Sequence, residues 1–176
     1  MWAPDKARLE AAGVTGFGVI DPREIVFGQE IRDICEGNGC GGYGKTWACP
    51  PYHGTVEECR ERCLSYARAL VFQTVYPIED SFDYEGMFEA GHAFKAVCRS
   101  VQAIAREELP RFLLLGNEGC GKCAKCTCPD APCRFPEDLI PAVEGYGIYV
   151  NKLAESAGIK YINGANTVTY FGMLLY

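Results

Sequence analysis

The chain has 176 residues, 48% of them hydrophobic, and a formal net charge of -6. This size and composition exclude a disordered chain and predict one globular domain over residues 1–176. The longest apolar runs are too short for a membrane span, the N-terminus is too polar for a secretory signal, and there is no basic stripe, so we expect a cytoplasmic protein that binds neither nucleic acid nor a membrane.

The first third of the chain predicts a helix, a strand, an irregular loop and a second helix. Residues 1–12 have the pattern of a short helix, and residues 24–34 alternate apolar and polar side chains as a half-buried strand does. Residues 35–54 are rich in Gly, Cys and Pro, which indicates an ordered loop that needs an external cross-link to hold it in place. Thr55 and Glu58 form a capping-box pattern, which predicts a helix that runs to Ala69.

The remainder of the chain alternates predicted strands with predicted helices. The expected strands cover residues 70–76, 112–115 and 167–176, and the expected helices cover residues 84–109, a short turn from Pro136, and residues 150–157. This order predicts an α+β (or α/β) layered single domain, with a mixed sheet, helices and two cysteine-rich metal-binding loops.

The strongest motif is a cysteine cluster near residue 120. The chain contains 11 cysteines, and in a reducing compartment such clustering favours metal ligation over disulfides. The second cluster has the spacing C-x2-C-x2-C-x6-C and comprises Cys120, Cys123, Cys126 and Cys133. Consecutive C-x2-C steps are typical of proteins that hold a 4Fe-4S cluster, so we predict such a cluster here.

Cys128 competes with Cys133 for the role of fourth ligand. Cys128 precedes Pro129, as the fourth cysteine of a ferredoxin motif precedes a proline, but only one residue separates it from Cys126. So short a tether would crowd one iron, and we therefore favour Cys133 and leave the role of Cys128 open. Lys122, Lys125 and Arg134 flank the motif, where they can offset thiolate charge or simply be solvated.

Zinc is the alternative metal for this site. Four thiolates also suit a tetrahedral zinc ion, although zinc usually takes its ligands from two separated C-x2-C knuckles. The alternative function is accordingly a zinc-binding structural or interaction module without catalysis.

The first cluster, Cys35, Cys40 and Cys49, lies in the glycine-rich loop and is a second candidate metal site. Three ligands would leave one iron of a cluster open to a substrate, whereas a fourth ligand from Cys59, Cys63 or His53 would close the site. Residues 39–46 also fit the phosphate-loop pattern, but the prolines that follow Cys49 prevent the helix that such a loop requires.

The other cysteines and the histidines have simpler interpretations. Cys59, Cys63 and Cys98 fall on apolar helical stripes, and we expect them to pack in the core as small hydrophobic residues. Neither His53 nor His92 lies in a pattern that assigns it a catalytic role.

Together the two motifs resemble those of a known family. The chain resembles the predicted metal-binding proteins of bacteria and archaea grouped as domain-of-unknown-function family 2284. The matching segments are Cys35-x4-Cys40 with Tyr43-Gly44-Lys45, Cys49-Pro50-Pro51-Tyr52, the cysteines from Gly119 to Cys126, Pro132-Cys133-Arg134, and Glu144 to Ile148. The resemblance spans most of the chain and implies metal or iron-sulfur binding, without an activity.

The sequence therefore predicts an iron-sulfur protein with a redox or electron-transfer role. One 4Fe-4S cluster is expected at the second cysteine group, and a second metal site, which could activate a substrate, at the first. The partner would be a redox protein or a small-molecule substrate, and the sequence fixes neither the oligomeric state nor whether the protein is an enzyme.

Overall fold

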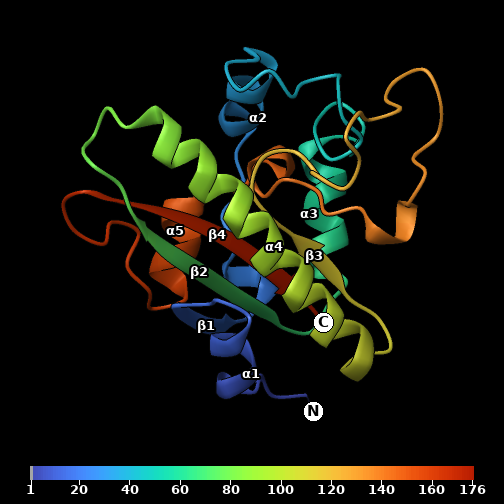
Figure 1. The fold of residues 1–176 in the computed structure, drawn as a ribbon. Helices are drawn as coiled ribbons and strands as arrows, with labels where there is room; N and C mark the ends of the chain where they lie inside the picture. Colours follow the sequence, from blue (N-terminus) through green and yellow to red (C-terminus); the bar gives the residue numbers. More distant parts are fainter. Residues whose placement is uncertain (1) are drawn as a thin grey trace.

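A computed structural model describes residues 2–176 and is built on a four-stranded sheet in the order β1-β2-β4-β3. The strands are β1 (Gly16–Ile20), β2 (Ala69–Pro77), β3 (Leu113–Leu115) and β4 (Thr167–Leu175). Each neighbouring pair is antiparallel. The long strands β2 and β4 pair along their whole length at the centre of the sheet, as Figure 1 shows.

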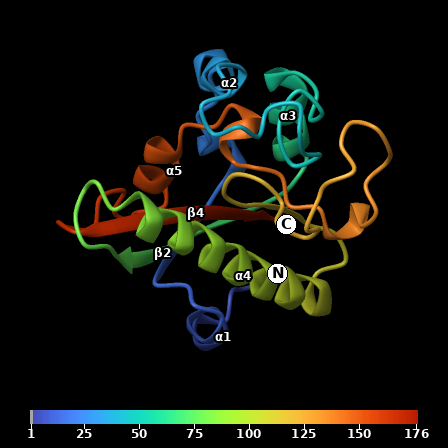
Figure 2. The same cartoon turned by 45° about the horizontal axis from the view of Figure 1, so that its top comes forward.

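Helices cover both faces of this sheet. Figure 2 shows α1 (Lys6–Ala11) and α4 (Tyr84–Glu108) on one face, and α2 (Gln29–Glu36), α3 (Val56–Leu64) and α5 (Val150–Ser156) on the other. Three short 3-10 helices complete the fold: η1 (Pro22–Glu24), η2 (Pro136–Asp138) and η3 (Glu144–Tyr146). The cysteine-rich segments lie on the same side of the sheet as α2 and α3.

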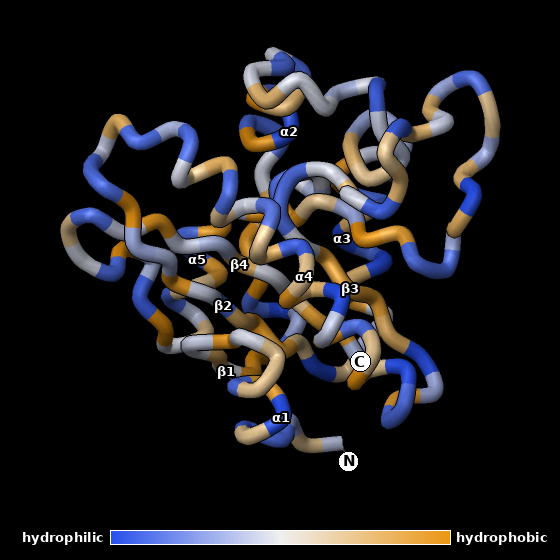
Figure 3. The backbone as a smooth tube through the Cα atoms, in the orientation of Figure 1, coloured by the Kyte–Doolittle hydropathy of each residue, from blue (hydrophilic) through white to orange (hydrophobic). Residues whose placement is uncertain are grey.

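Two hydrophobic cores form because successive side chains of a strand point to opposite faces of the sheet. Leu70 and Phe72 of β2 pack in the core that contains Phe94 of α4. Val71 of β2 packs in the other core, which contains Cys59 of α3. Figure 3 shows hydrophobic residues concentrated along the central strands. The rigid sheet thus supports the cysteine-rich segments, which have no long element of their own.

The structure confirms the predicted α+β fold and most of its elements. The strands at residues 70–76 and 167–176 and the long helix at 84–109 are present as β2, β4 and α4. The predicted capping box at Thr55 and Glu58 forms, although α3 ends at Leu64 instead of Ala69. The expected mixed sheet is antiparallel in all its strand pairs. The first helix begins at Lys6, and Met1 lies outside the described residues.

The strand predicted at residues 24–34 is wrong, because most of this segment belongs to α2. Phe27 makes only an isolated bridge to Ile148. Beyond Gly28 the inward-facing residues are Ile31, Arg32 and Cys35, at helical spacing. Ile25 and Phe27 precede α2, whereas Ile31 lies within it, so their strand-like alternation is a coincidence.

Strand β1 was not predicted, because its two glycines do not favour a strand. Packing explains one of them: a Cβ atom on Gly18 would lie 2.0 Å from the carbonyl oxygen of Ala157, just beyond α5. Only glycine permits this close approach of two backbones.

We expect Gly18→Ala to lower the free energy of unfolding by about 1–3 kcal/mol, the usual range for overpacking. Urea unfolding followed by circular dichroism measures the change. Gly39→Ala is the matched control, since no atom lies within 4 Å of its added Cβ. Equal stability of the two variants would contradict the packing of β1 against α5.

Candidate metal centre

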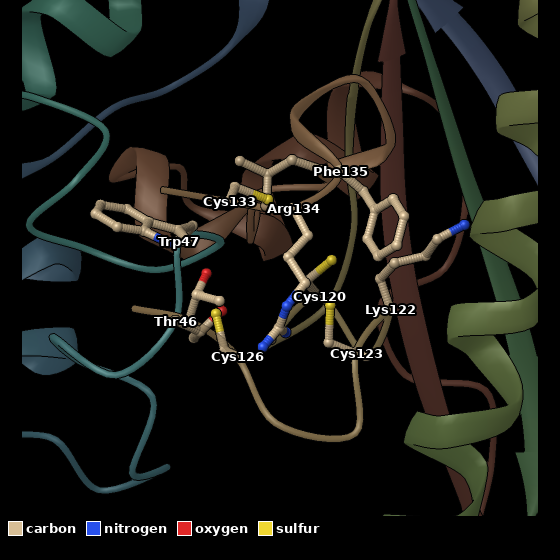
Figure 4. Close-up of a pocket in the computed structure, with 13 residues that line it drawn as sticks. Thr46, Trp47, Cys120, Lys122, Cys123, Cys126, Cys133, Arg134 and Phe135 are labelled. Atoms are coloured by element: carbon tan, nitrogen blue, oxygen red, sulfur yellow. The ribbon is translucent and has the colours of Figure 1, made fainter. Parts of the chain in front are cut away.

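The four cysteines of the second cluster line a single pocket, here called the four-cysteine pocket. Cys120, Cys123, Cys126 and Cys133 all contribute to its wall, together with Thr46, Trp47, Lys122, Arg134 and Phe135. Figure 4 shows the four thiols around this space, with Thr46 next to Cys126. The structure therefore places the four predicted ligands at one pocket, although Cys120 and Cys133 are 13 positions apart in the chain.

A tight turn returns Cys133 to the pocket. The Ala131 N–H donates to the Thr127 carbonyl at 3.0 Å, and the Thr127 hydroxyl donates to the Pro132 carbonyl at 2.9 Å. These bonds fold the segment between the third and fourth cysteines back on itself. The x6 spacing of the motif is thus the length that this turn requires.

Cys128 is directed away from the four-cysteine pocket. Its side chain is 9% exposed, and its thiol donates to the Gly44 carbonyl at 3.7 Å. Its backbone N–H donates to the Cys126 sulfur at 3.5 Å. Cys128 is therefore not among the residues that line the pocket, and it supports a neighbouring thiol through its N–H.

Arg99 of α4 donates a hydrogen bond to one of the pocket sulfurs, that of Cys120. Its Nη2 donates to both the carbonyl oxygen and the sulfur of Cys120, each at 3.1 Å. Its Nη1 contacts the Gln102 side chain at 3.2 Å and the backbone carbonyl of Asp138, both uncharged. The guanidinium therefore has no carboxylate partner among these contacts, and its hydrogen bond to the Cys120 sulfur comes from a charged donor.

Two of the cations that flank the motif, Lys122 and Arg134, make hydrogen bonds or ion pairs with groups other than the thiols. Lys122 pairs with the Asp138 carboxylate at 2.8 Å, and Arg106 pairs with the same carboxylate at 2.6 Å. Hydrogen bonds from these two cations lower the pKa of Asp138 to about 2. Arg134 donates to the carbonyl of Lys125 at 2.9 Å and so closes the loop. The ion pairs of Asp138 thus brace the pocket rim, whereas the side chain of Arg134 also lines the pocket itself.

The surroundings of Cys126 favour its thiolate. Partial burial opposes ionisation, but the Cys128 N–H donates to the sulfur at 3.5 Å, nearby polar groups of Trp47, Thr46 and Thr127 act in the same direction, and the net pKa is lowered. Two of these donors, Thr46 and Trp47, come from the first cysteine loop. A thiolate is the form that binds a metal.

The first cluster lines a second pocket, here called the three-cysteine pocket. Cys35, Cys40 and Cys49 share it with Tyr43, Pro50, Phe88, Glu118 and Glu144. Cys35 lies in the last turn of α2, where the sequence had placed the start of the loop. A Cβ on Gly42 would lie 3.0 Å from the Cys49 sulfur and 3.7 Å from the Cys40 sulfur, so glycine lets both thiols approach the backbone.

Burial and like charges oppose ionisation in the three-cysteine pocket. Burial and the neighbouring Cys40 and Cys35 thiols raise the pKa of Cys49 to about 11, although an N–H of Gly119 bonds to its sulfur. Desolvation raises the pKa of Glu144 to about 7, even though the residue keeps accessible surface at the pocket. A bound cation would offset the repulsion between the ionised thiols, and metal binding in the three-cysteine pocket must release protons from them.

The two pockets are adjacent. Gly119 lines the four-cysteine pocket, and its N–H acts to lower the pKa of Cys49 in the three-cysteine pocket. Thr46 and Trp47 lie between Cys40 and Cys49 in the chain, yet they form part of the wall around the other cluster. The sequence could not show this proximity, because about 70 residues separate the two motifs.

The candidate extra ligands lie elsewhere. Cys59, Cys63 and Cys98 are buried at 0%, 0% and 2% exposure, which confirms the prediction that they pack in the core. His53 is also buried, and burial lowers its pKa to about 4. None of the three cysteines is among the residues that line the three-cysteine pocket, and nor is His53.

The cysteines of each group line a pocket, but their thiols do not meet at one point. Over residues 2–176, no set of three or more His, Cys, Asp and Glu side chains stands close enough to hold a metal ion. All 11 cysteines are free thiols. In the same range, no helix has the length and apolar character to cross a membrane.

Sequence reasoning missed the residues that surround the thiols. Arg99 lies in the middle of a long helix and belongs to no motif, so no local signal identifies it. Glu144 had a signal, because it begins one of the segments that resemble the family, but its place beside Cys35 follows only from the fold.

Comparison with known proteins gives one match. No curated protein and no solved structure matches the chain. A family model described as "Predicted metal-binding protein (DUF2284)" matches residues 18–176, which include both cysteine clusters. The chain therefore belongs to the DUF2284 family of predicted metal-binding proteins.

Proposed function

We propose that the protein holds a 4Fe-4S cluster in the four-cysteine pocket and uses it for electron transfer. Cys120, Cys123, Cys126 and Cys133 would be the ligands, each through one thiolate. The observation that carries the proposal is that these four thiols surround one pocket while Cys128 does not line it. A bound cluster of this type supplies one-electron redox chemistry.

The surroundings of the pocket fit such a group. Thiolate ligation of a cluster accumulates negative charge, which hydrogen bonds to sulfur and nearby cations offset. Arg99 donates to the Cys120 sulfur, and the Cys128 N–H donates to the Cys126 sulfur. These contacts hold two of the four sulfurs in place before a metal arrives.

The three-cysteine pocket is proposed as a second metal site, where a small-molecule substrate binds. Its three thiols would leave a coordination position free, and the carboxyl groups of Glu118 and Glu144 line the same space. A redox partner protein would exchange electrons at the four-cysteine pocket. The abundance of free thiols favours a reducing compartment such as the cytoplasm.

Reversible reduction tests the redox role. Protein purified without oxygen should be brown, lose much of its visible absorption when dithionite is added, and recover it on mild oxidation. Zinc has no redox chemistry, so a colourless protein whose spectrum ignores dithionite would favour the structural zinc module instead.

A further inference from the structure

The two cysteine segments contribute to each other's pockets. Trp47 bridges them, because its indole N–H donates to the Ala131 carbonyl at 3.2 Å. Cys128 bridges them in the other direction through its bond to the Gly44 carbonyl at 3.7 Å. Residues of the first loop therefore touch both sides of the turn that positions Cys133.

The contacts reach the candidate ligands themselves. Thr46 and Trp47 line the four-cysteine pocket together with Cys126, and Figure 4 shows Thr46 next to that thiol. In return, Gly119, the neighbour of Cys120, shares a surface hollow with Cys40 of the first cluster. Each cluster thus lies beside a residue that is one to three positions from a ligand of the other.

Thr46 is held firmly in this role. Its hydroxyl oxygen accepts a bond from the Ala48 N–H at 3.1 Å, which leaves the hydroxyl proton available to another acceptor. The Ala48 carbonyl accepts the Ala142 N–H at 2.9 Å. Cys49 follows immediately, so a ligand of the first site and a donor to the second belong to one short braced segment.

We infer that Thr46 and Trp47 are positioning residues of the four-cysteine pocket and that they couple it to the three-cysteine pocket. This inference rests on the proposed function, since it assumes that both pockets hold metal. Ligation of Cys49 fixes the segment that carries Thr46 and Trp47, and this segment fixes Cys126. Occupancy of the first site therefore sets how tightly the second site holds its metal, and the effect is reciprocal.

The first test replaces the hydroxyl donor. Metal release from the four-cysteine pocket to EDTA is followed in Thr46→Val and in the matched control Thr46→Ser, which keeps the hydroxyl. Loss of such an outer hydrogen bond typically weakens metal binding by about 10-fold or more, so Thr46→Val should release metal about 10-fold faster. Thr46→Ser should behave as the unaltered protein. Equal release rates for the two variants would overturn the role of Thr46.

The second test reaches the same pocket from a distance. Cys35 lines the three-cysteine pocket and is not among the residues that line the four-cysteine pocket. Cys35→Ser should also speed metal release from the four-cysteine pocket. Since both changes act through Cys126, the double variant Cys35→Ser/Thr46→Val should release metal no faster than the faster single variant.

Two outcomes overturn the coupling. The first is that Cys35→Ser releases metal from the four-cysteine pocket at the rate of the unaltered protein. The second is that the increase in release rate of the double variant equals the product of the increases of the two single variants. Circular dichroism of each variant shows whether the fold is retained. EDTA withdraws zinc as well as iron, so a zinc-loaded protein would contradict the proposed redox function while this coupling could still be measured. The two failures are therefore distinguishable.

Discussion

Replacing Cys133 with serine should remove most of the metal from the four-cysteine pocket. Cys133 completes the wall of that pocket, and the hydrogen-bonded turn from Thr127 to Pro132 brings it there. A serine hydroxyl is a much poorer metal ligand than a thiolate at neutral pH. We expect Cys133→Ser, purified without oxygen, to retain less than about half of the iron of the unaltered protein, measured by elemental analysis.

Cys128→Ser is the matched control for this change. Cys128 lies two residues from Cys126 but contacts Gly44 through its thiol, which a serine hydroxyl can imitate. Its metal content should stay close to that of the unaltered protein. Full iron in Cys133→Ser together with loss of iron from Cys128→Ser would show that the two cysteines have been assigned to the wrong roles.

Replacing Arg99 with glutamine should lower the reduction potential of the four-cysteine site. The guanidinium donates to the Cys120 sulfur at 3.1 Å, and a positive charge there favours the more negative, reduced state. If that preference is about 1.4 kcal/mol, the midpoint potential falls by about 60 mV for a one-electron couple. A dye-mediated redox titration, followed by visible absorption, measures the shift.

Two further variants separate charge from structure. Arg99→Lys keeps the charge and should shift the potential less than Arg99→Gln. Arg106 lies on the same helix and pairs with Asp138 at 2.6 Å, at the pocket rim, without a bond to a thiol. If Arg106→Gln shifts the potential as far as Arg99→Gln does, the effect is a general loss of positive charge and the specific bond to Cys120 has no special role.

The predicted elements succeed where one residue pattern dominates a long segment. The apolar run of β2 and the helical period of α4 are strong signals. The capping box of Thr55 and Glu58 marks the start of α3, because each side chain bonds to the backbone N–H of the other residue. The failures lie where tertiary contacts decide. Glycine is required at position 18 of β1 because a carbonyl of Ala157 occupies the space beside it, and no local pattern contains that information.

The candidate site divides in the same way. Cysteine spacing was enough to predict which four thiols share a pocket, because the motif is local and its turn is short. It could not reveal Arg99, which approaches Cys120 from a helix on the opposite face of the sheet from α3. Nor could it reveal that Thr46 belongs to the other cluster's surroundings. These contacts depend on how the sheet places distant segments together.

Analysis of iron and acid-labile sulfide, combined with electron paramagnetic resonance, tests the central claim most directly. Protein purified without oxygen should contain about 4 irons and about 4 sulfides per chain for a single 4Fe-4S cluster, and more if the three-cysteine pocket is also filled. After reduction, it should show a paramagnetic signal that Cys133→Ser loses. Zinc at about one or two ions per chain, with no labile sulfide and no signal, would contradict the iron-sulfur assignment.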